Sequence, residues 1–219
     1  MIASVIFDMD GTLFNTERIY FECYRQAAAE MGLNFTFELF AQGVGISREE
    51  ANRFIKQHFG PQTDTERLQK RTYELVEEYL ARGGDIPFLP GAKKAVELFY
   101  KRGLTLALAS SNMRRWVDFY LHKKQLEKYF PVITTCEDVT NLKPNPEVYL
   151  RTAAKLNQDP KNCLVFEDSV AGATAAIHAQ MRTCMVPNIK SPDSFVRQHA
   201  FKIYTSLEEV PADLDELLS

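Results

Sequence analysis

Two carboxylates, Asp8 and Asp10, follow the apolar run Val5–Phe7 and are followed in turn by Gly11. A buried charge is costly unless it is paired, so carboxylates at the end of a buried strand are expected to have partners. With one residue between them in a turn, the two can lie on different sides of a bound phosphoryl group. One can then act as the nucleophile and the other as the proton donor. The same pentapeptide also fits an Asx turn that caps the following helix.

Further polar residues that suit such a site lie beyond three later apolar runs. They are Ser110, Ser111, Lys143, Glu167 and Asp168. The adjacent carboxylates of Glu167 and Asp168 suit a hard divalent cation such as Mg²⁺, because this ion takes oxygen ligands. We expect the ion to be bound by Asp8, Asp168 and a backbone carbonyl near Asp10, with positions left for water and a phosphate oxygen.

The remaining candidates would hold a phosphate group. The ammonium of Lys143 would offset the negative charge, bind a phosphate oxygen and favour the ionised form of Asp8. The hydroxyl and the backbone N–H of Ser110 would bind another phosphate oxygen. Alone, each feature has an ordinary interpretation: a solvated lysine, a helix cap at Ser-Ser-Asn, and favourable charge at a helix N-terminus for Glu-Asp. Their joint occurrence after successive strands favours a metal-assisted phosphoryl-transfer site.

Short apolar runs predict the strands that would position these residues, the last of them only weakly. They are Ala3–Phe7, Thr105–Ala109, Val132–Thr135, Cys163–Phe166, Thr183–Val186 and Lys202–Tyr204. Their hydrophobicity is nearly continuous, which is typical of strands covered on both faces. They alternate with the helical patterns Gly91–Arg102, Arg114–Leu121, Pro146–Asn157 and Val170–Ala179. This alternation predicts an α/β fold with a doubly wound parallel sheet, which binds ligands at the carboxyl ends of its strands.

A long helical insertion separates the first two predicted strands. Roughly 100 residues lie between them, far more than a crossover connection needs. The helices predicted in this segment are Thr16–Met31, Ser47–Phe59 and Thr65–Arg82. Thr16 is suited to cap the first helix, and Ser47 opens a capping box for the second. We therefore expect an α/β core of residues 1–14 and 89–219 and a small inserted α-helical cap domain of residues 15–88.

The bulk composition narrows the class of protein. Of the 219 residues, 45% are hydrophobic and 25% are charged, which is ordinary for a soluble globular protein. The formal net charge of −3 gives no reason to expect a nucleic acid or a membrane surface as partner. We expect a cytoplasmic monomer without a signal peptide or membrane span, whose four scattered cysteines are reduced thiols. The four histidines lack the spacing of metal ligands.

The motifs together resemble those of the haloacid dehalogenase superfamily, in particular the β-phosphoglucomutase-like phosphatases with an inserted helical cap. Four motifs appear in the family's order, namely Asp8-Met9-Asp10-Gly11-Thr12, Leu108-Ala109-Ser110, Lys143-Pro144-Asn145-Pro146 and Glu167-Asp168-Ser169. The resemblance extends from residue 1 to about residue 190. Any one of these motifs would be a weak signal, whereas four in order are highly specific.

The resemblance implies a role for each matching position. Asp8 would be the nucleophile that forms an aspartyl-phosphate. Asp10 would protonate the leaving oxygen and then take a proton from the attacking water. The phosphate-binding residues would be Ser110, Ser111 and Lys143. The Mg²⁺ ligands would be Asp8, Asp10, Asp168 and, directly or through water, Glu167. The cap would close over the substrate and exclude bulk water.

Departures from the family pattern bear on the substrate. An aspartate is common where Asn15 stands, although Thr16 is retained as a candidate substrate residue. The sugar-phosphate mutases carry a histidine where Tyr20 stands, and this difference favours a phosphatase. Residues 45–49 resemble the cap loop whose arginine grips the distal phosphate in mutases, so Arg48 is a second candidate substrate residue.

We therefore expect a Mg²⁺-dependent phosphatase that acts on a small phosphorylated metabolite, with a sugar phosphate as the preferred candidate. The alternative is a β-phosphoglucomutase-like isomerase. A catalytically inactive binding module is disfavoured because no motif position is altered.

Overall fold

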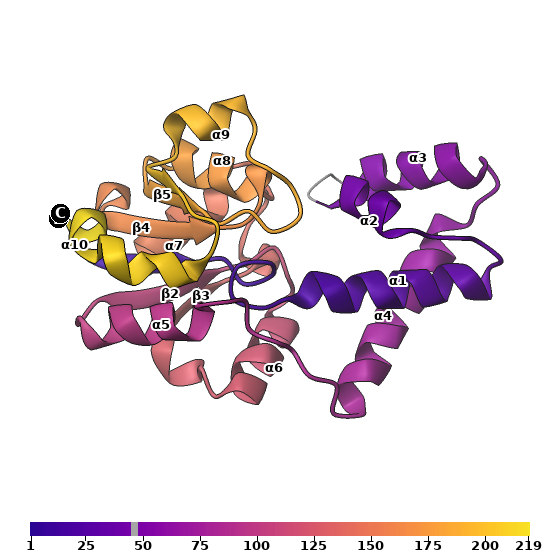
Figure 1. Ribbon diagram of the computed structural model, residues 1–219, viewed down its shortest axis with the longest axis horizontal. Coiled ribbons are helices and arrows are strands. Elements are labelled where there is room, and N and C mark those ends of the chain that lie inside the picture. Colours follow the sequence, from indigo (N-terminus) through magenta and orange to yellow (C-terminus); the bar gives the residue numbers. More distant parts are fainter. Residues whose placement is uncertain (45–47) are drawn as a thin grey trace. The chain divides into compact units, whose positions relative to one another are not determined.

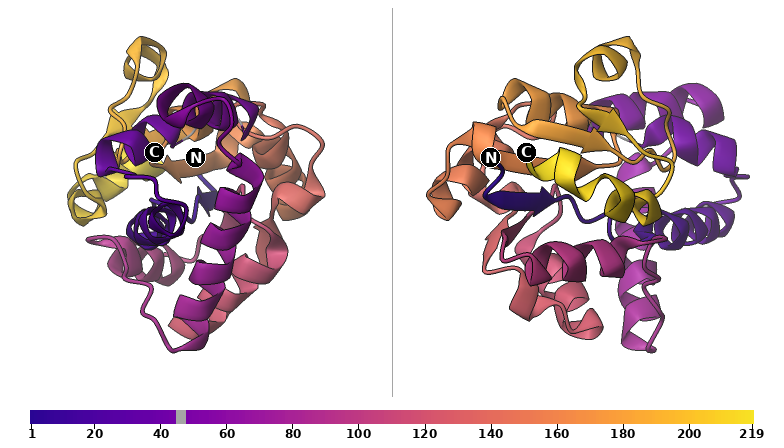
Figure 2. Two further views of the ribbon diagram at one scale, coloured as in Figure 1. Left: turned by 90° about the vertical axis from the view of Figure 1, so that its right-hand side faces the viewer. Right: turned by 60° about the vertical axis from the view of Figure 1, so that its left-hand side comes forward.

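The computed structural model describes residues 1–44 and 48–219, without the side chain of Arg48. Residues 15–87 form one compact unit, which we call the helical unit, and the rest of the described chain forms another, the α/β unit. Figure 1 labels most of the helices and strands, and Figure 2 shows the ribbon from two further sides.

The α/β unit is built on a six-stranded sheet. Its strands are β1 (Ser4–Phe7), β2 (Thr105–Ala109), β3 (Val132–Thr134), β4 (Cys163–Glu167), β5 (Arg182–Met185) and β6 (Lys202–Ile203). They lie in the order β3-β2-β1-β4-β5-β6, and every neighbouring pair is parallel. The chain thus adds strands on one side of β1 and then, from β4 onward, on the other side. This is a doubly wound parallel sheet, so the predicted fold class is confirmed.

Helices connect the strands of this unit. They are α5 (Ala92–Lys101), α6 (Arg114–Lys124), α7 (Glu147–Leu156), α8 (Val170–His178), α9 (Ser194–His199) and α10 (Leu214–Leu218). Short 3₁₀ helices lie at Glu127–Tyr129, Cys136–Asp138, Pro160–Asn162 and Leu207–Asp213. Helix α9 was not predicted, because six residues are too few to show a helical period. Its one sequence signal is Asp193, whose side chain accepts a hydrogen bond of 2.8 Å from the N–H of Val196.

Both faces of the sheet are covered, which explains the unbroken hydrophobicity of the strands. Neighbouring residues of a strand point to opposite faces. On one face, Ile6 of β1 belongs to a buried cluster that includes Tyr149 of α7 and Ala176 of α8. On the other face, the ring of Phe7 contacts that of Phe99 in α5, with the ring centroids 6.2 Å apart.

The helical unit contains four helices among its described residues. They are α1 (Thr16–Glu30), α2 (Phe37–Gly43), α3 (Arg48–Phe59) and α4 (Thr65–Ala81). Helices α1 and α4 pack against each other, and Arg71 of α4 donates two hydrogen bonds of 2.7 and 3.1 Å to Glu30 of α1. Helix α2 was not predicted, since seven residues make less than two full turns of a helix.

The N-terminus of α1 differs from the prediction. Asn15 occupies the N-cap position, and Thr16 is the first helical residue. Thr16 is 1% exposed, and no hydrogen-bond partner of its hydroxyl lies among the described residues. The two side chains share a preference for this position, so the sequence could not decide between them. The capping box predicted at Ser47 lies outside the described residues.

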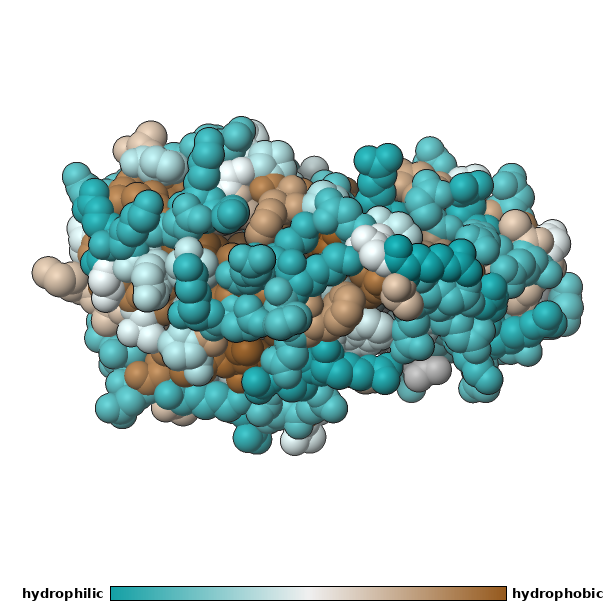
Figure 3. All heavy atoms as spheres, turned by 90° about the horizontal axis from the view of Figure 1, so that it is seen from below, coloured by the Kyte–Doolittle hydropathy of each residue, from teal (hydrophilic) through white to brown (hydrophobic). Residues whose placement is uncertain are grey.

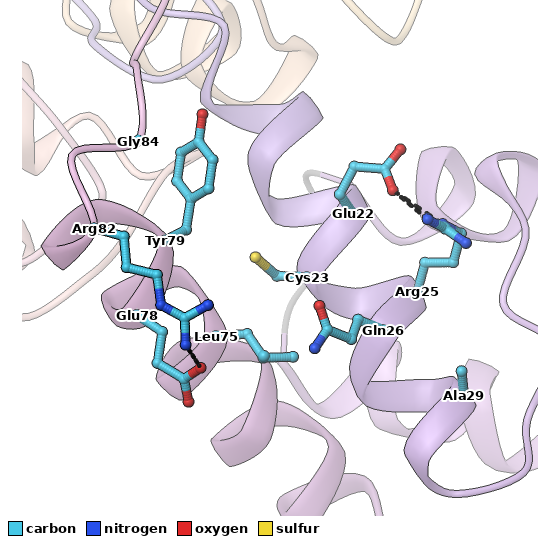
Figure 4. Close-up of a pocket in the computed structure, with 10 residues that line it drawn as sticks. All are labelled: Glu22, Cys23, Arg25, Gln26, Ala29, Leu75, Glu78, Tyr79, Arg82 and Gly84. Atoms are coloured by element: carbon cyan, nitrogen blue, oxygen red, sulfur yellow. Dashed lines mark hydrogen bonds and ion pairs between the residues drawn. The ribbon is translucent and has the colours of Figure 1, made fainter.

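A groove of about 550 Å³ lies between α1 and α4 (Figure 4). The sulfur of Cys23 and the side chain of Leu75 point into it, and charged side chains line both walls. Arg25 pairs with Glu22 at 2.7 Å on α1. On the opposite wall, Arg82 pairs with Glu78 at 3.5 Å. These charges therefore pair along their own segment of chain and not across the groove.

The surface is mostly hydrophilic where Figure 3 shows it. Teal, hydrophilic residues predominate on that face, and brown, hydrophobic atoms lie mainly in the gaps between them. Large hydrophobic side chains with substantial exposure are spread along the chain, as at Phe37, Met113 and Leu142. Scattered exposure of this kind is normal for globular proteins. No described helix combines the length and the apolar character needed to cross a membrane.

Candidate active site

The motif residues converge where the direction of strand addition reverses. Asp8 directly follows β1, and Glu167 is the last residue of β4, which lies beside β1 in the sheet. Because parallel strands end at the same edge, their carboxylates are brought together. One oxygen each from Asp8, Glu167 and Asp168 lies within 4.8 Å of the others, and all three residues are buried. We call these three residues with Lys143 the carboxylate–lysine cluster.

Lys143 joins the ends of three strands, β1, β4 and β2, through its ammonium group. Its Nζ lies 2.6 Å from Oδ1 of Asp8 and 2.6 Å from Oε1 of Glu167, and its side chain is 7% exposed. The third contact is a hydrogen bond of 3.0 Å to the carbonyl of Ala109, the last residue of β2. A lysine ammonium has three N–H groups, so these contacts use all of them. Binding a phosphate oxygen therefore requires Lys143 to share or exchange one of these bonds.

Burial and charge act in opposite directions on the two partners of this ion pair. Burial raises the pKa of Asp8 well above its ordinary value, although the ammonium of Lys143 lowers it; the carboxylates of Glu167 and Asp10 raise it further. The expectation that Lys143 favours the ionised form holds for its own contribution, but burial outweighs it. For Lys143 itself, burial lowers the pKa, but the carboxylates of Asp8 and Glu167 outweigh burial and hold it well above the ordinary value. The lysine is therefore charged at neutral pH.

Both carboxylate oxygens of Glu167 accept hydrogen bonds within the protein. Oε1 accepts from Lys143 at 2.6 Å and from the hydroxyl of Tyr149 at 2.7 Å. Oε2 accepts from the backbone N–H groups of Asp168 and Ser169 at 3.1 and 3.2 Å, and from the Ser169 hydroxyl at 3.0 Å. Burial raises the pKa of Tyr149 well above its ordinary value, and the Glu167 charge raises it further, so the phenol remains a donor. Glu167 is thus fixed from both sides.

Two glycines allow this close packing. Gly11 has φ of +81°, and a Cβ built on it would overlap the carboxylate of Asp168. A Cβ on Gly172, near the start of α8, would overlap the carboxylate of Glu167. Only a residue without a side chain fits at either position. Gly11 belongs to the Asp8 motif, whereas no pattern in the sequence marks Gly172.

Asp10 lies on the turn that follows Asp8. The side-chain amide of Asn112 donates a hydrogen bond of 3.4 Å to its Oδ2. Because Asn112 follows β2, this contact links the turn after β1 to the turn after β2. The Ser-Ser-Asn run was predicted to bind phosphate through its serines, and the role of its asparagine was missed.

The two serines are placed differently. Ser110 is 1% exposed, and its Oγ accepts a hydrogen bond of 3.0 Å from the N–H of Asn112. Its own backbone N–H donates to the carbonyl of Thr134 at 2.9 Å. The expectation that this N–H binds a phosphate oxygen is therefore wrong, because the sheet already uses it; the hydroxyl proton is still able to donate. Ser111 is exposed at the surface of the same turn.

The two candidate substrate residues lie in the helical unit. Thr16 is buried at the start of α1. Arg48 begins α3, but its side chain lies outside the described part of the structure, so its predicted contact with substrate stays a prediction.

The buried cysteines are poor candidates for the nucleophile. Burial raises the pKa of Cys23 and of Cys163 to about 11 and that of Cys184 to about 12. Their thiols are therefore protonated near neutral pH and weakly nucleophilic. All four cysteines are free thiols, as predicted.

Known proteins are similar to this chain in both sequence and fold. The family described as haloacid dehalogenase-like hydrolase matches residues 5–186, which confirms the resemblance drawn from the motifs. A phosphorylated carbohydrates phosphatase of Thermotoga maritima is 36% identical over 79% of this chain and 79% of its own length. Hexitol phosphatase B of Escherichia coli is 34% identical over 85% of this chain and 84% of its own length.

Solved structures with the same fold include one from Thermotoga maritima that is provisionally named a β-phosphoglucomutase. It is 32% identical, with a TM-score of 0.80 over 99% of this chain and all of its own. The structure of CbbY from Rhodobacter sphaeroides in complex with phosphate is 22% identical, with a TM-score of 0.80 over 98% of this chain and all of its own. At that identity the second likeness concerns the fold alone.

Proposed function

Because this chain belongs to the haloacid dehalogenase-like hydrolase family, we propose that it is a Mg²⁺-dependent phosphatase that works through an aspartyl-phosphate on Asp8. One observation carries the proposal. The ammonium of Lys143 joins the buried carboxylates of Asp8 and Glu167 at the carboxyl ends of neighbouring strands. Phosphoryl transfer is catalysed by positioning and by stabilising negative charge, and a fixed ammonium beside a carboxylate nucleophile supplies both.

Each step of the proposed reaction is assigned to a carboxylate of the site. An oxygen of Asp8 attacks phosphorus, and the bond from phosphorus to the ester oxygen breaks as Asp10 gives that oxygen a proton. Asp10, now ionised, takes a proton from a water molecule that attacks the phosphorus of the aspartyl-phosphate. Inorganic phosphate leaves and Asp8 is regenerated. The amide of Asn112 supports Asp10 through its contact with Oδ2.

The buried carboxylates fit a hard divalent cation, since their oxygens lie close together and carry like charge. Asp8, Asp168 and the backbone carbonyl of Asp10 would hold Mg²⁺. Glu167 fits the water-mediated alternative, because protein donors already bond both of its oxygens. When bound, the ion neutralises charge around the phosphate and favours the ionised, nucleophilic form of Asp8.

A small phosphorylated carbohydrate is the substrate class that the relatives favour. Two relatives more than 30% identical over most of the chain are named as phosphatases of phosphorylated carbohydrates and of hexitols. We propose that residues 15–88 act as a cap over such a substrate, with Thr16 and Arg48 among its contacts. The phosphate-binding roles of Ser110 and Ser111 and a cytoplasmic, monomeric state are parts of the same proposal.

A β-phosphoglucomutase-like isomerase is the second candidate, favoured by Arg48 and by the naming of one solved structure. Tyr20 opposes it, because it stands where the mutases carry a histidine. Its ring contacts Tyr73 of α4, with centroids 6.4 Å apart. A glucose 1-phosphate assay with a sugar bisphosphate activator separates the two. Conversion to glucose 6-phosphate without release of phosphate would establish the isomerase.

A panel of phosphate esters tests the proposed function. Phosphate release is measured on sugar, polyol and nucleotide monophosphates, with Mg²⁺ and with EDTA. We expect release from a sugar or polyol phosphate that stops with EDTA, returns with Mg²⁺ and is absent in Asp8→Asn. The matched control is Asp215→Asn, whose side chain is 99% exposed, and it should retain activity. Metal-independent hydrolysis, or hydrolysis by Asp8→Asn, would contradict the proposal.

A further inference from the structure

Tyr149 lies beneath the carboxylate–lysine cluster and contacts two of its members. It is fully buried in α7, the helix that follows the Lys143-Pro144 loop. Its hydroxyl donates a hydrogen bond of 2.7 Å to Oε1 of Glu167. The ammonium of Lys143 lies 5.1 Å from the centre of its ring. One side chain thus contacts both the lysine and the carboxylate that anchors it.

Two of the three hydrogen bonds made by Lys143 go to groups of the protein other than Asp8. One N–H is held by the Ala109 carbonyl, and a second by Glu167. Glu167 is in turn held by Tyr149 at Oε1 and by the start of α8 at Oε2. The third N–H is then directed at Oδ1 of Asp8, 2.6 Å away, where the phosphoryl group would arrive.

We propose that Tyr149 is a positioning residue, whose hydroxyl and ring fix Glu167 and the Lys143 ammonium so that the remaining N–H points at Asp8 and its phosphoryl group. This inference rests on the proposed function, because it concerns how the lysine of the same site is positioned. A phenylalanine would fill the same apolar space, so packing alone does not explain the hydroxyl. A buried hydroxyl needs a partner, and here the partner is the anchor of the lysine. The ring face adds an attraction for the ammonium.

Tyr149→Phe tests the inference because it removes one oxygen and keeps the ring. Tyr204→Phe is the matched control. Tyr204 is also buried, at 1% exposure, and also has a lysine over its ring, Lys202 at 5.6 Å. It lies beyond β6, at the edge of the sheet, with two strands, β4 and β5, between β6 and β1. Both variants are assayed on p-nitrophenyl phosphate with saturating Mg²⁺.

For Tyr149→Phe we expect kcat to fall about tenfold, as for the loss of one hydrogen bond to a buried charge. Isothermal titration with inorganic phosphate in Mg²⁺ should show affinity about fivefold weaker, whereas titration with Mg²⁺ alone should stay within about twofold of wild type. Tyr204→Phe should match wild type throughout. Wild-type kcat and phosphate affinity in Tyr149→Phe would overturn the inference. A loss of Mg²⁺ affinity without a loss of phosphate affinity would overturn it too, because Tyr149 would then act on the metal.

A double-mutant cycle tests whether Tyr149 acts through the lysine. In a Lys143→Ala background, Tyr149→Phe should cause no further loss of activity on p-nitrophenyl phosphate. An undiminished tenfold loss in that background would contradict the inference. If the wild-type chain hydrolyses no ester of the panel, the proposed function fails. The phosphate titration of the single variant still decides on Tyr149, because it needs binding and no turnover.

Discussion

Replacing Gly172 by alanine has two opposite effects on stability: it favours the helix, but it also creates a steric overlap with Glu167. Gly172 is buried within α8 (Val170–His178), where alanine is intrinsically favoured over glycine by about 1 kcal/mol. A Cβ at this position would overlap Oε1, Cδ and Oε2 of Glu167. The Glu167 carboxylate would have to move, and its bonds to Lys143 at 2.6 Å and to Tyr149 at 2.7 Å would be lost or weakened.

The overlap with Glu167 costs more free energy than the gain in helix propensity supplies. A hydrogen bond to a charged group contributes about 1.5–3 kcal/mol, so two such bonds outweigh the gain in helix propensity. Allowing for relaxation, we expect Gly172→Ala to lower the free energy of unfolding by about 3 kcal/mol. Because Glu167 anchors Lys143, we also expect kcat/KM to fall at least about tenfold.

Urea unfolding followed by circular dichroism measures the first quantity, and Mg²⁺-dependent hydrolysis of p-nitrophenyl phosphate measures the second. Gly43→Ala is the matched control. Gly43 is the last residue of α2, its φ is not positive, and a Cβ on it would meet no atom within 4 Å. This control should be neutral or slightly stabilising. A Gly172→Ala variant with wild-type stability and activity would refute the reasoning that Glu167 is held in one place.

Three further changes test other parts of the site and fold. Gly11→Ala combines a φ of +81° with overlap of the Asp168 carboxylate, so it should raise the Mg²⁺ concentration needed for half-maximal activity; Gly32→Ala, with φ of +72° and nothing within 4 Å, should leave that concentration unchanged. Lys143→Ala should lower kcat/KM on p-nitrophenyl phosphate about 10²–10³-fold, and a loss under about threefold would contradict a role at the phosphoryl group. Asp138 pairs with Lys155 at 2.8 Å, and hydrogen bonding to this lysine lowers the pKa of Asp138 from 3.8 to about 2. The carboxylate therefore stabilises the fold above its ordinary pKa and ceases to do so as the pH falls toward 2. Asp138→Asn should therefore cost about 1 kcal/mol of unfolding free energy at pH 7, after allowance for solvent screening, and less at pH 3; an equal cost at both values would be inconsistent with this linkage.

The sequence was sufficient for the sheet and for the place of the site. A strand buried on both faces must be apolar throughout, so runs such as Val5–Phe7 and Cys163–Phe166 were recognisable without any contact information. The carboxylates that follow them had to meet, because parallel strands end together. Short elements were missed for a related reason: α2 and α9 are too brief to show a period, and only Thr36 and Asp193 mark where they begin.

The hydrogen bonds of the site could not be predicted, because they depend on tertiary packing. The N–H of Ser110 looked available for phosphate, yet the neighbouring strand uses it. Tyr149 fitted an apolar helix face, and nothing in the local pattern showed that its hydroxyl meets Glu167, 18 residues away in sequence. A signal did exist, since a tyrosine on an inward face needs a partner for its hydroxyl. The overlap at Gly172 likewise follows only from the distance between α8 and the end of β4.

The central claim is that Asp8 accepts the phosphoryl group. Asp10→Asn should slow hydrolysis of the intermediate, while p-nitrophenolate, a good leaving group, still departs without a proton from Asp10. We therefore expect acid-quenched Asp10→Asn enzyme, digested and analysed by mass spectrometry, to carry one phosphoryl group on the peptide that contains Asp8. The Asp8→Asn, Asp10→Asn double variant should carry none. A phosphoryl group on another peptide, or the same modification in the double variant, would contradict the account.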